Sequence, residues 1–399
     1  MDSVEGNIKL LLQGKDVEES QEFCDFTLDM QNEVTAAKGV APSTPADFTP
    51  TLRDNVCYIV AAVLVNDEGH VLMMQEAKSS CAGKWYLPAG RMEAGETIVE
   101  AAKREVLEET GLETDITTLI MVESASGSWF RFVVTGNVLG GTLKTPACAD
   151  KESLQAKWVE DLGELSLRGN DIYPLIQRAK QYCARKEEPW HPMLLPINKP
   201  HTRLLLRLVI AIRKRVNNRL CILTSDKTAT HLPVTEVNPV RSLHSTLRKY
   251  MTEIFGSDLP PHRPQGVLNV ELKTSSPSGN HDGMCLTLLV PVRKALEDVP
   301  LIDKYSWIEL SKPVGEDLLN RMGKNMTVPL NVIRSDFPSR YDDSRGKRSI
   351  YHHSFNSCLA KNIQASQSIL HSELQHPSPT IRVQALYFSP PELKSIHYF

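Results

Sequence analysis

Three carboxylates in residues 90–112 (GRMEAGETIVEAAKREVLEETGL) have the types and spacing for metal chemistry. Glu105, Glu108 and Glu109 stand at positions i, i+3 and i+4, so a helix would place all three on one face. Like charges packed that closely disfavour ionisation unless a cation lies between them. Oxygen ligands suit Mg²⁺, with Mn²⁺ as an alternative, and the pattern therefore predicts a divalent-metal site.

A helix must begin shortly before these acids to hold them in this order. Thr97 and Glu100 form a capping-box pattern, so we expect the helix to begin at Thr97. Gly111 is expected as a left-handed C-terminal cap, and Gly90 and Gly95 bracket a loop that must bend sharply. The acids are expected to point away from a buried stripe, which consists of Ile98, Ala101, Ala102 and Val106.

The same segment resembles the signature of the Nudix hydrolases, which cleave a nucleoside diphosphate linked to a further group. The matching positions are Gly90, Glu96, Arg104, Glu105, Val106, Glu108, Glu109, Gly111 and Leu112. The resemblance implies that Glu105 and Glu109 are metal ligands and that Glu108 is a ligand or the base. It also implies that a backbone carbonyl of Ala89 or Gly90 completes the metal shell.

Two further acids and one arginine are expected to support the site. Glu96 would orient Arg104 and the start of the helix, while Arg104 would hold Glu96 or Glu105 or form an ordinary helix ion pair. In this family an additional acid often precedes the last strand. Glu152, six residues before Trp158, is the candidate, with an exposed surface acid as the alternative.

The flanking residues resemble the 8-oxo-dGDP phosphatases of the MutT-homologue group. The similar stretches are residues 55–58 (NVCY), 75–78 (QEAK), 85–93 (WYLPAGRME) and 231–235 (HLPVT). The resemblance implies Mg²⁺-dependent hydrolysis of 8-oxo-dGDP, 8-oxo-GDP and similar diphosphates to monophosphates and phosphate, which would cleanse the nucleotide pool. Another Nudix substrate, such as ADP-ribose or a nucleotide sugar, is the alternative. A non-catalytic nucleotide-binding or partner-binding protein is a third interpretation.

The base of the substrate is expected to stack on aromatic rings and to meet polar groups that discriminate by buried hydrogen bonds. Apolar residues at such positions are more often part of the core than contacts, as their usual burial indicates. The candidates are Tyr58, Leu72, Arg91, Trp129, Phe132, Arg168, Asn170 and Asp171.

Composition narrows the class of protein. The net charge of −3 argues against binding a nucleic acid polymer. No apolar run is long enough to span a membrane, and the acidic N-terminus does not resemble a signal peptide. The scattered cysteines form no CxxC pair, and a reducing, cytoplasmic setting is expected. A small nucleotide is the expected partner, and no protein partner is indicated.

The chain of 399 residues is long enough for two folded units. We expect residues 1–52 to be an extension and linker, and residues 53–186 to form an α/β/α sandwich with a mixed sheet. Residues 187–199 contain several prolines and are expected to link the units. Residues 200–330 are expected to form a second α/β domain, and the Ser- and His-rich residues 331–399 a disordered tail.

The second domain is expected to be a degenerate copy of the first. Leu232 lies 145 residues after Leu87, and Gly256 stands at the same offset from Gly111. An unrelated α/β domain with chance matches is the alternative. At this offset most of the acids are lost: Glu105 becomes Tyr250, Glu109 becomes Ile254, and only Glu108 keeps a carboxylate, as Glu253.

Overall fold

The computed structural model describes residues 2–185, 191–275, 279, 281–323 and 326–333. The tail predicted for 331–399 lies outside these ranges from residue 334 onward, as do residues 187–190 of the predicted linker. Residues 331 and 332 are not tail, because they belong to strand β14 (Leu330–Val332), which pairs in parallel with strand β5 (Leu112–Ser126). In the described part of the chain, no helix is long and apolar enough to cross a membrane.

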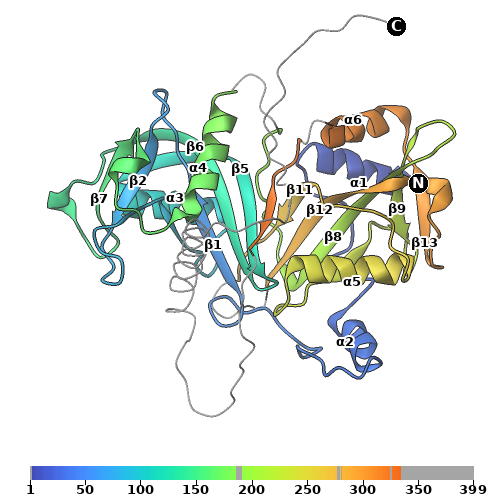
Figure 1. Ribbon diagram of the computed structural model, residues 1–399. Helices are drawn as coiled ribbons and strands as arrows, with labels where there is room; N and C mark the ends of the chain where they lie inside the picture. The colour runs from blue at the N-terminus through green and yellow to red at the C-terminus, as the bar shows by residue number, and fades with distance from the viewer. Residues whose placement is uncertain (1, 186–190, 276–278, 280, 324–325, 334–399) are drawn as a thin grey trace, which may run out of the picture. The chain divides into compact units, whose positions relative to one another are not determined.

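Residues 53–186, here called the first half, have the predicted order of strands, helix, strands, helix (Figure 1). The main sheet has the order β14-β5-β6-β1-β4, and a smaller sheet has the order β3-β2-β7. The remaining elements are β1 (Cys57–Ala62), β2 (Val71–Glu76), β3 (Trp85–Tyr86), β4 (Ala89–Arg91), α3 (Ile98–Thr110), β6 (Trp129–Gly141), β7 (Ser153–Val159) and α4 (Tyr173–Cys183).

The main sheet of the first half is mixed, as predicted. β1 runs parallel to β6 and antiparallel to β4. Successive side chains of a strand point to opposite faces. Phe132 and Val134 of β6 join the apolar cluster that contains the buried stripe of α3, whereas Val133 joins the cluster that contains α4. The two helices therefore cover opposite faces of the sheet, which gives the predicted α/β/α sandwich.

Residues 200–330, here called the second half, contain a second mixed sheet with the order β11-β12-β8-β9-β13, and β10 also pairs with β8. Helices α5 and α6 belong to this half. The bounds are β8 (His201–Arg213), β9 (Leu220–Ser225), β10 (Val234–Glu236), α5 (Leu243–Phe255), β11 (Gly266–Glu271), β12 (Asp282–Ala295), β13 (Tyr305–Glu309) and α6 (Lys312–Gly323). Short 3₁₀ turns occupy Pro146–Cys148, Leu162–Glu164, Asn170–Ile172 and Leu296–Asp298.

The two halves share their strand pairings. β8 runs parallel to β12 and antiparallel to β10, just as β1 runs parallel to β6 and antiparallel to β4. Both ends of β10 and of α5 lie 145 residues after the corresponding ends of β4 and α3. Thr97 and Ser242, at the same offset, each cap their helix through a side-chain oxygen. This strand–loop–helix arrangement is the one that the repeat hypothesis requires.

The N-terminal extension is not peripheral. It contains two helices, α1 (Asp2–Leu12) and α2 (Leu28–Ala36), where an extension and linker were expected. Val4, Ile8 and Leu11 of α1 are buried in one apolar cluster with residues of β9 and α6. The predicted linker is also packed, because the carbonyl of Leu194 accepts a hydrogen bond from the Leu119 N–H.

Candidate active site

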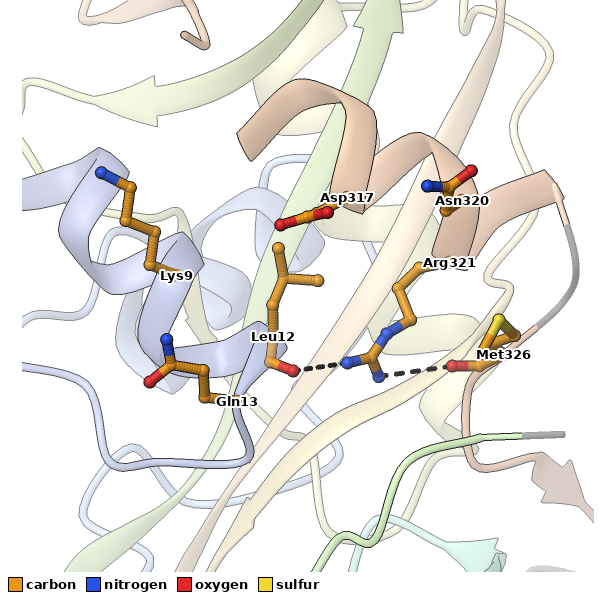
Figure 2. A pocket seen from close by; sticks show the side chains of 7 residues that line it. All are labelled: Lys9, Leu12, Gln13, Asp317, Asn320, Arg321 and Met326. Atoms are coloured by element: carbon orange, nitrogen blue, oxygen red, sulfur yellow. Dashed lines mark hydrogen bonds between the residues drawn. The ribbon is translucent and has the colours of Figure 1, made fainter. Parts of the chain in front are cut away.

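A cleft of about 260 Å³ opens between α1 and α6, but it contains none of the predicted site residues (Figure 2). Arg321 crosses it and donates to the carbonyl oxygens of Leu12 and Met326. This cleft lies between the N-terminal extension and the second half, away from the acids of α3.

Helix α3 begins and ends as predicted. Thr97 is its N-cap, and the reciprocal hydrogen bonds of a capping box join Thr97 and Glu100. Gly111 ends the helix in the left-handed region, with φ of 78°. The four predicted stripe residues are all fully buried. The acids therefore stand on a helix that is fixed at both ends and along its apolar face.

Glu105 and Glu109 point inward, which corrects the expectation that they face away from the buried side. Glu105 is 8% exposed and Glu109 only 1%. Glu109 Oε2 accepts a hydrogen bond of 2.9 Å from the Ala89 N–H. Glu105 lies against Gly90, where an added Cβ would stand 2.0 Å from its Oε1. The inward direction is possible because β4 offers a free backbone donor and a residue without a side chain.

The burial of these two acids has an electrostatic consequence. Burial raises the pKa of Glu105, although hydrogen bonds from Arg104 work in the opposite direction. Burial, together with the negative charge of Glu105, raises the pKa of Glu109 well above its ordinary value. Two buried carboxylates that repel each other would both ionise more readily beside an added cation.

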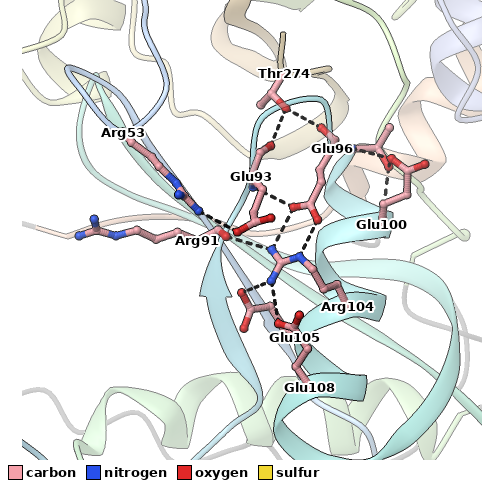
Figure 3. Close-up of polar contacts among 10 residues, drawn as sticks. Arg53, Arg91, Glu93, Glu96, Glu100, Arg104, Glu105, Glu108 and Thr274 are labelled. Carbon is pink, nitrogen blue, oxygen red and sulfur yellow. Dashed lines mark hydrogen bonds and ion pairs between the residues drawn. The ribbon is translucent and has the colours of Figure 1, made fainter. Parts of the chain in front are cut away.

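Arg104 lies among the acids, as the sequence indicated (Figure 3). It donates to Glu96 at 2.5 and 2.9 Å and to Glu105 at 2.8 Å. It also contacts Glu108 at 3.2 Å and the carbonyl of Arg91 at 3.1 Å. Burial raises the pKa of Glu96, but the hydrogen bonds from Arg104 and the Glu93 N–H, together with the positive charge of Arg104, outweigh burial and lower this pKa. Arg104 therefore fixes Glu96 and Glu105 relative to each other.

The three acids do not form one cluster. The side chain of Glu108 is 45% exposed and contacts Arg104, whereas Glu109 faces Ala89. Among the described residues, no group of three His, Cys, Asp or Glu side chains is close enough to hold a metal ion. The donor chemistry still fits a divalent cation, because Glu105 and Glu109 present buried carboxylate oxygens beside a glycine that leaves room for no side chain.

The second half supports the loop that precedes α3. The Thr274 hydroxyl lies 2.9 Å from the carbonyl oxygens of both Glu93 and Glu96 (Figure 3). The Glu96 carboxylate in turn accepts a hydrogen bond of 2.8 Å from the Glu93 N–H. The loop is therefore held from inside by Glu96 and from the other half by Thr274.

Comparison with known proteins identifies the family. The NUDIX domain family matches residues 57–174. The chain is 37% identical over 298 residues to the 8-oxo-dGDP phosphatase NUDT18 of Danio rerio, an alignment that covers 71% of this chain and 90% of that protein. The chain belongs to the Nudix hydrolase family. The Homo sapiens protein of the same name is 36% identical over 303 residues, which cover 72% of this chain and 92% of that protein. A solved NUDIX hydrolase from Nitrosomonas europaea is 29% identical, covers 34% of this chain and 93% of its own, and has a TM-score of 0.28.

The two alignments to the phosphatases extend well beyond the matched NUDIX domain. They span 298 and 303 residues, whereas the domain match covers residues 57–174. These relatives therefore share sequence with this chain outside its Nudix domain as well.

Glu152, the predicted additional acid of the Nudix site, directly precedes β7. Its carboxylate is 3.6 Å from Lys151 Nζ, and its side chain is 32% exposed. Sequence reasoning missed a second acid, Glu76, at the end of β2. Glu76 is 1% exposed, and its charge contributes to the raised pKa of Glu109. Its sequence signals were its place at the end of an apolar run and within residues 75–78, one of the stretches that carry the family resemblance.

One oxygen of Glu76 is paired and the other is not. Oε1 accepts a hydrogen bond of 2.5 Å from Arg168, whereas Oε2 is buried without a hydrogen-bond partner among the described residues. In the β2–β7 pairing Glu76 stands opposite Ser153, whose hydroxyl donates to the Glu109 carbonyl at 2.7 Å. An unpaired buried carboxylate oxygen is costly, so it marks a position where a cation or donor would be stabilised.

A polar network extends from Glu76 through the first half. The guanidinium of Arg168 lies 4.7 Å from the centre of the Tyr86 ring. The Tyr86 hydroxyl and Arg131 both donate to Asp171, at 2.7 and 2.8 Å. Two of the predicted substrate contacts, Arg168 and Asp171, are therefore occupied by protein partners.

The other predicted base contacts are dispersed. Tyr58, Leu72 and Phe132 are fully buried in the core, which corrects their expected role as contacts. The Tyr58 hydroxyl is used between the two halves, where it donates to the carbonyl of Asp282 at 2.7 Å. The side chain of Arg91 points away from the acids (Figure 3), Trp129 is half-buried, and Asn170 is exposed.

Proposed function

We propose that this Nudix hydrolase converts 8-oxo-dGDP, 8-oxo-GDP and similar oxidised purine nucleoside diphosphates to monophosphates and phosphate. The observation that carries the proposal is the 37% identity over 90% of the length of the Danio rerio 8-oxo-dGDP phosphatase. Buried, mutually repelling Glu105 and Glu109 beside Gly90 support the same reaction class. The cellular purpose would be to remove damaged precursors from the nucleotide pool.

The chemistry assigned to each residue follows from its contacts. We propose that Glu105 and Glu109, with a carbonyl of Ala89 or Gly90, hold Mg²⁺ or Mn²⁺. Glu108 is exposed enough to act as a further ligand or as the base that takes a proton from water. Bound there, the metal neutralises phosphoryl oxygens and lowers the pKa of the attacking water.

Positioning residues keep these ligands in place. Arg104 holds Glu105 through a hydrogen bond of 2.8 Å and is itself held by Glu96. We propose Glu76 as the additional acid in preference to Glu152, because Glu76 is buried with a free oxygen whereas Glu152 contacts Lys151. The identity of the residues that read the base stays a prediction.

A substrate panel tests the proposed function. Formation of the nucleoside monophosphate in Mg²⁺, measured by chromatography, should be fastest with 8-oxo-dGDP and 8-oxo-GDP, slower with dGDP and GDP, and slower again with the matching triphosphates. Faster hydrolysis of ADP-ribose or a nucleotide sugar would assign a different Nudix substrate. Failure to turn over any of these compounds would indicate a binding protein.

We further propose the domain division predicted from the sequence, with residues 200–330 as a degenerate Nudix-like domain. The shared strand pairings and the constant offset of 145 residues between α3 and α5 support it. The loss of two of the three acids, to Tyr250 and Ile254, leaves this half without the ligands of a metal site. A cytoplasmic location stays a prediction.

A further inference from the structure

In the first half, the acids of α3 lie beside β4. In the second half, the corresponding position beside β10 is filled by the N-terminal extension. Residues 25–28 lie beside β10 as an added parallel segment. The Asp25 N–H donates to the Val234 carbonyl at 2.8 Å, and the Glu236 N–H donates to the Phe26 carbonyl at 3.1 Å. β10 is thus paired on one edge by β8 and on the other by this segment.

Asp25 supplies the carboxylate that the second half has lost. At the offset of 145 residues, Val234 is the counterpart of Ala89, and Ile254 is the counterpart of Glu109. The Ala89 N–H donates to Glu109 at 2.9 Å, and the Val234 N–H donates to Asp25 Oδ2 at 2.9 Å. The same backbone donor therefore meets a carboxylate in both halves, from the helix in one and from the N-terminal segment in the other.

The remaining partners of Asp25 come from the second half. Tyr250, the counterpart of Glu105, donates its hydroxyl to Asp25 Oδ2 at 2.7 Å. Ser225 donates to Oδ1 at 2.5 Å, and His231 Nε2 lies 3.3 Å from the same oxygen. Asp25 is only 3% exposed. A buried carboxylate with this many donors is stable in place, whereas the donors left by its removal would be unsatisfied.

The segment is also anchored on both sides of Asp25. The Phe23 ring stacks on His231 with centroids 4.3 Å apart. The Leu28 N–H donates to the Glu236 carboxylate at 2.9 Å, and the Gln31 amide donates to the Glu236 carbonyl at 2.7 Å. These contacts reach from His231, three residues before β10, to Glu236, the last residue of β10.

We propose that residues 23–31 are a built-in occupant of the degenerate second site, with Asp25 in the place of the missing carboxylate. The segment closes the surface formed by β10, Tyr250 and His231 to nucleotides. It also makes the stability of the second half depend on the N-terminal extension. The proposal holds whichever substrate the first half hydrolyses.

Urea unfolding of the full chain tests whether Asp25 takes the place of the lost carboxylate, and a rescue variant provides a second comparison. Asp25→Ala should lower the unfolding midpoint, whereas Asp47→Ala, which changes an exposed aspartate of the same extension, should leave it nearly unchanged. Adding Ile254→Glu to Asp25→Ala restores a carboxylate at the counterpart of Glu109 and should recover part of the lost midpoint. An unchanged midpoint in Asp25→Ala, or a double variant less stable than Asp25→Ala, overturns the proposal.

Hydrogen exchange of the milder Asp25→Asn variant gives a second readout that does not need complete unfolding. Amides of residues 25–28 and 234–236 should lose protection together, while those of 98–110 in the first half stay protected. If residues 234–236 keep their protection when residues 25–28 lose theirs, the segment does not hold the second site closed. Turnover by the first half should be unchanged in Asp25→Asn.

Discussion

Gly90→Ala tests whether the close packing of Glu105, a proposed metal ligand, is needed for turnover. Gly90 does not have a positive φ, so alanine is compatible with the backbone. The new Cβ would stand 2.0 Å from Glu105 Oε1 and 2.3 Å from Oε2, where ordinary contact begins at 3.4 Å. The carboxylate must therefore move by more than 1 Å. A misplacement of about 1 Å costs on the order of 100-fold in rate, or about 2.7 kcal/mol of activation free energy.

The assay is phosphate release from an oxidised purine diphosphate in Mg²⁺, with urea unfolding measured on the same preparations. Gly140→Ala is the matched control, because an added Cβ there meets nothing within 4 Å and the backbone also lacks a positive φ. We expect turnover to fall about 100-fold in Gly90→Ala and to stay close to wild type in Gly140→Ala. A folded Gly90→Ala protein with near-normal turnover would refute the assignment of Glu105 as a closely positioned ligand.

Three further predictions concern residues outside the signature helix. Thr274→Val removes the hydroxyl that bonds the carbonyls of Glu93 and Glu96, and should lower turnover while the second half stays folded, as near-UV circular dichroism can check. Glu76→Gln should weaken Mn²⁺ binding, measured by electron paramagnetic resonance, by about 10- to 100-fold, whereas Glu152→Gln should leave it unchanged. Weaker binding in Glu152→Gln but not in Glu76→Gln would instead assign Glu152 as the additional acid. Burial opposes the charge of Glu271, but hydrogen bonds from His201 and the charge of Arg207 outweigh it and lower its pKa to about 2. Its charged form therefore stabilises the protein above the ordinary carboxyl pKa, and this stabilisation is lost as the pH falls towards 2. The difference in unfolding free energy between wild type and Glu271→Gln should shrink between pH 6 and pH 3, and a constant difference would contradict this account.

The elements that position the site could be predicted because their signals are local. The capping box, the apolar stripe and Gly111 set both ends and the buried face of α3 within one short segment. The contact of Arg104 with Glu96 and Glu105 also follows from residues that are close in sequence.

The direction of the acids was predicted wrongly, because acidic side chains were expected to avoid the buried face of the helix. Glu105 stands four residues after Ala101, and Glu109 stands seven residues after Ala102, so helical spacing places both acids on the face of the apolar stripe. Both are buried against β4, where Ala89 offers an N–H and Gly90 offers space. Whether a polar helix face meets solvent or a strand is a property of the tertiary structure.

Residues whose partners are distant in sequence were assigned wrongly or missed. Tyr58 was expected at the base, but its hydroxyl partner is Asp282 in the second half. Glu76 was not considered, because its partner Arg168 lies 92 residues away. The role of Asp25 depends on residues about 200 positions later, such as Ser225, and no local pattern marks it.

The most direct test of the account is the turnover of Glu109→Gln with 8-oxo-dGDP in Mg²⁺. Glutamine keeps the volume of the side chain and an oxygen that can accept the Ala89 N–H, so the fold should be retained. If buried carboxylates on α3 bind the metal, turnover should fall by several powers of ten. Near-normal turnover in the folded variant would contradict the central claim.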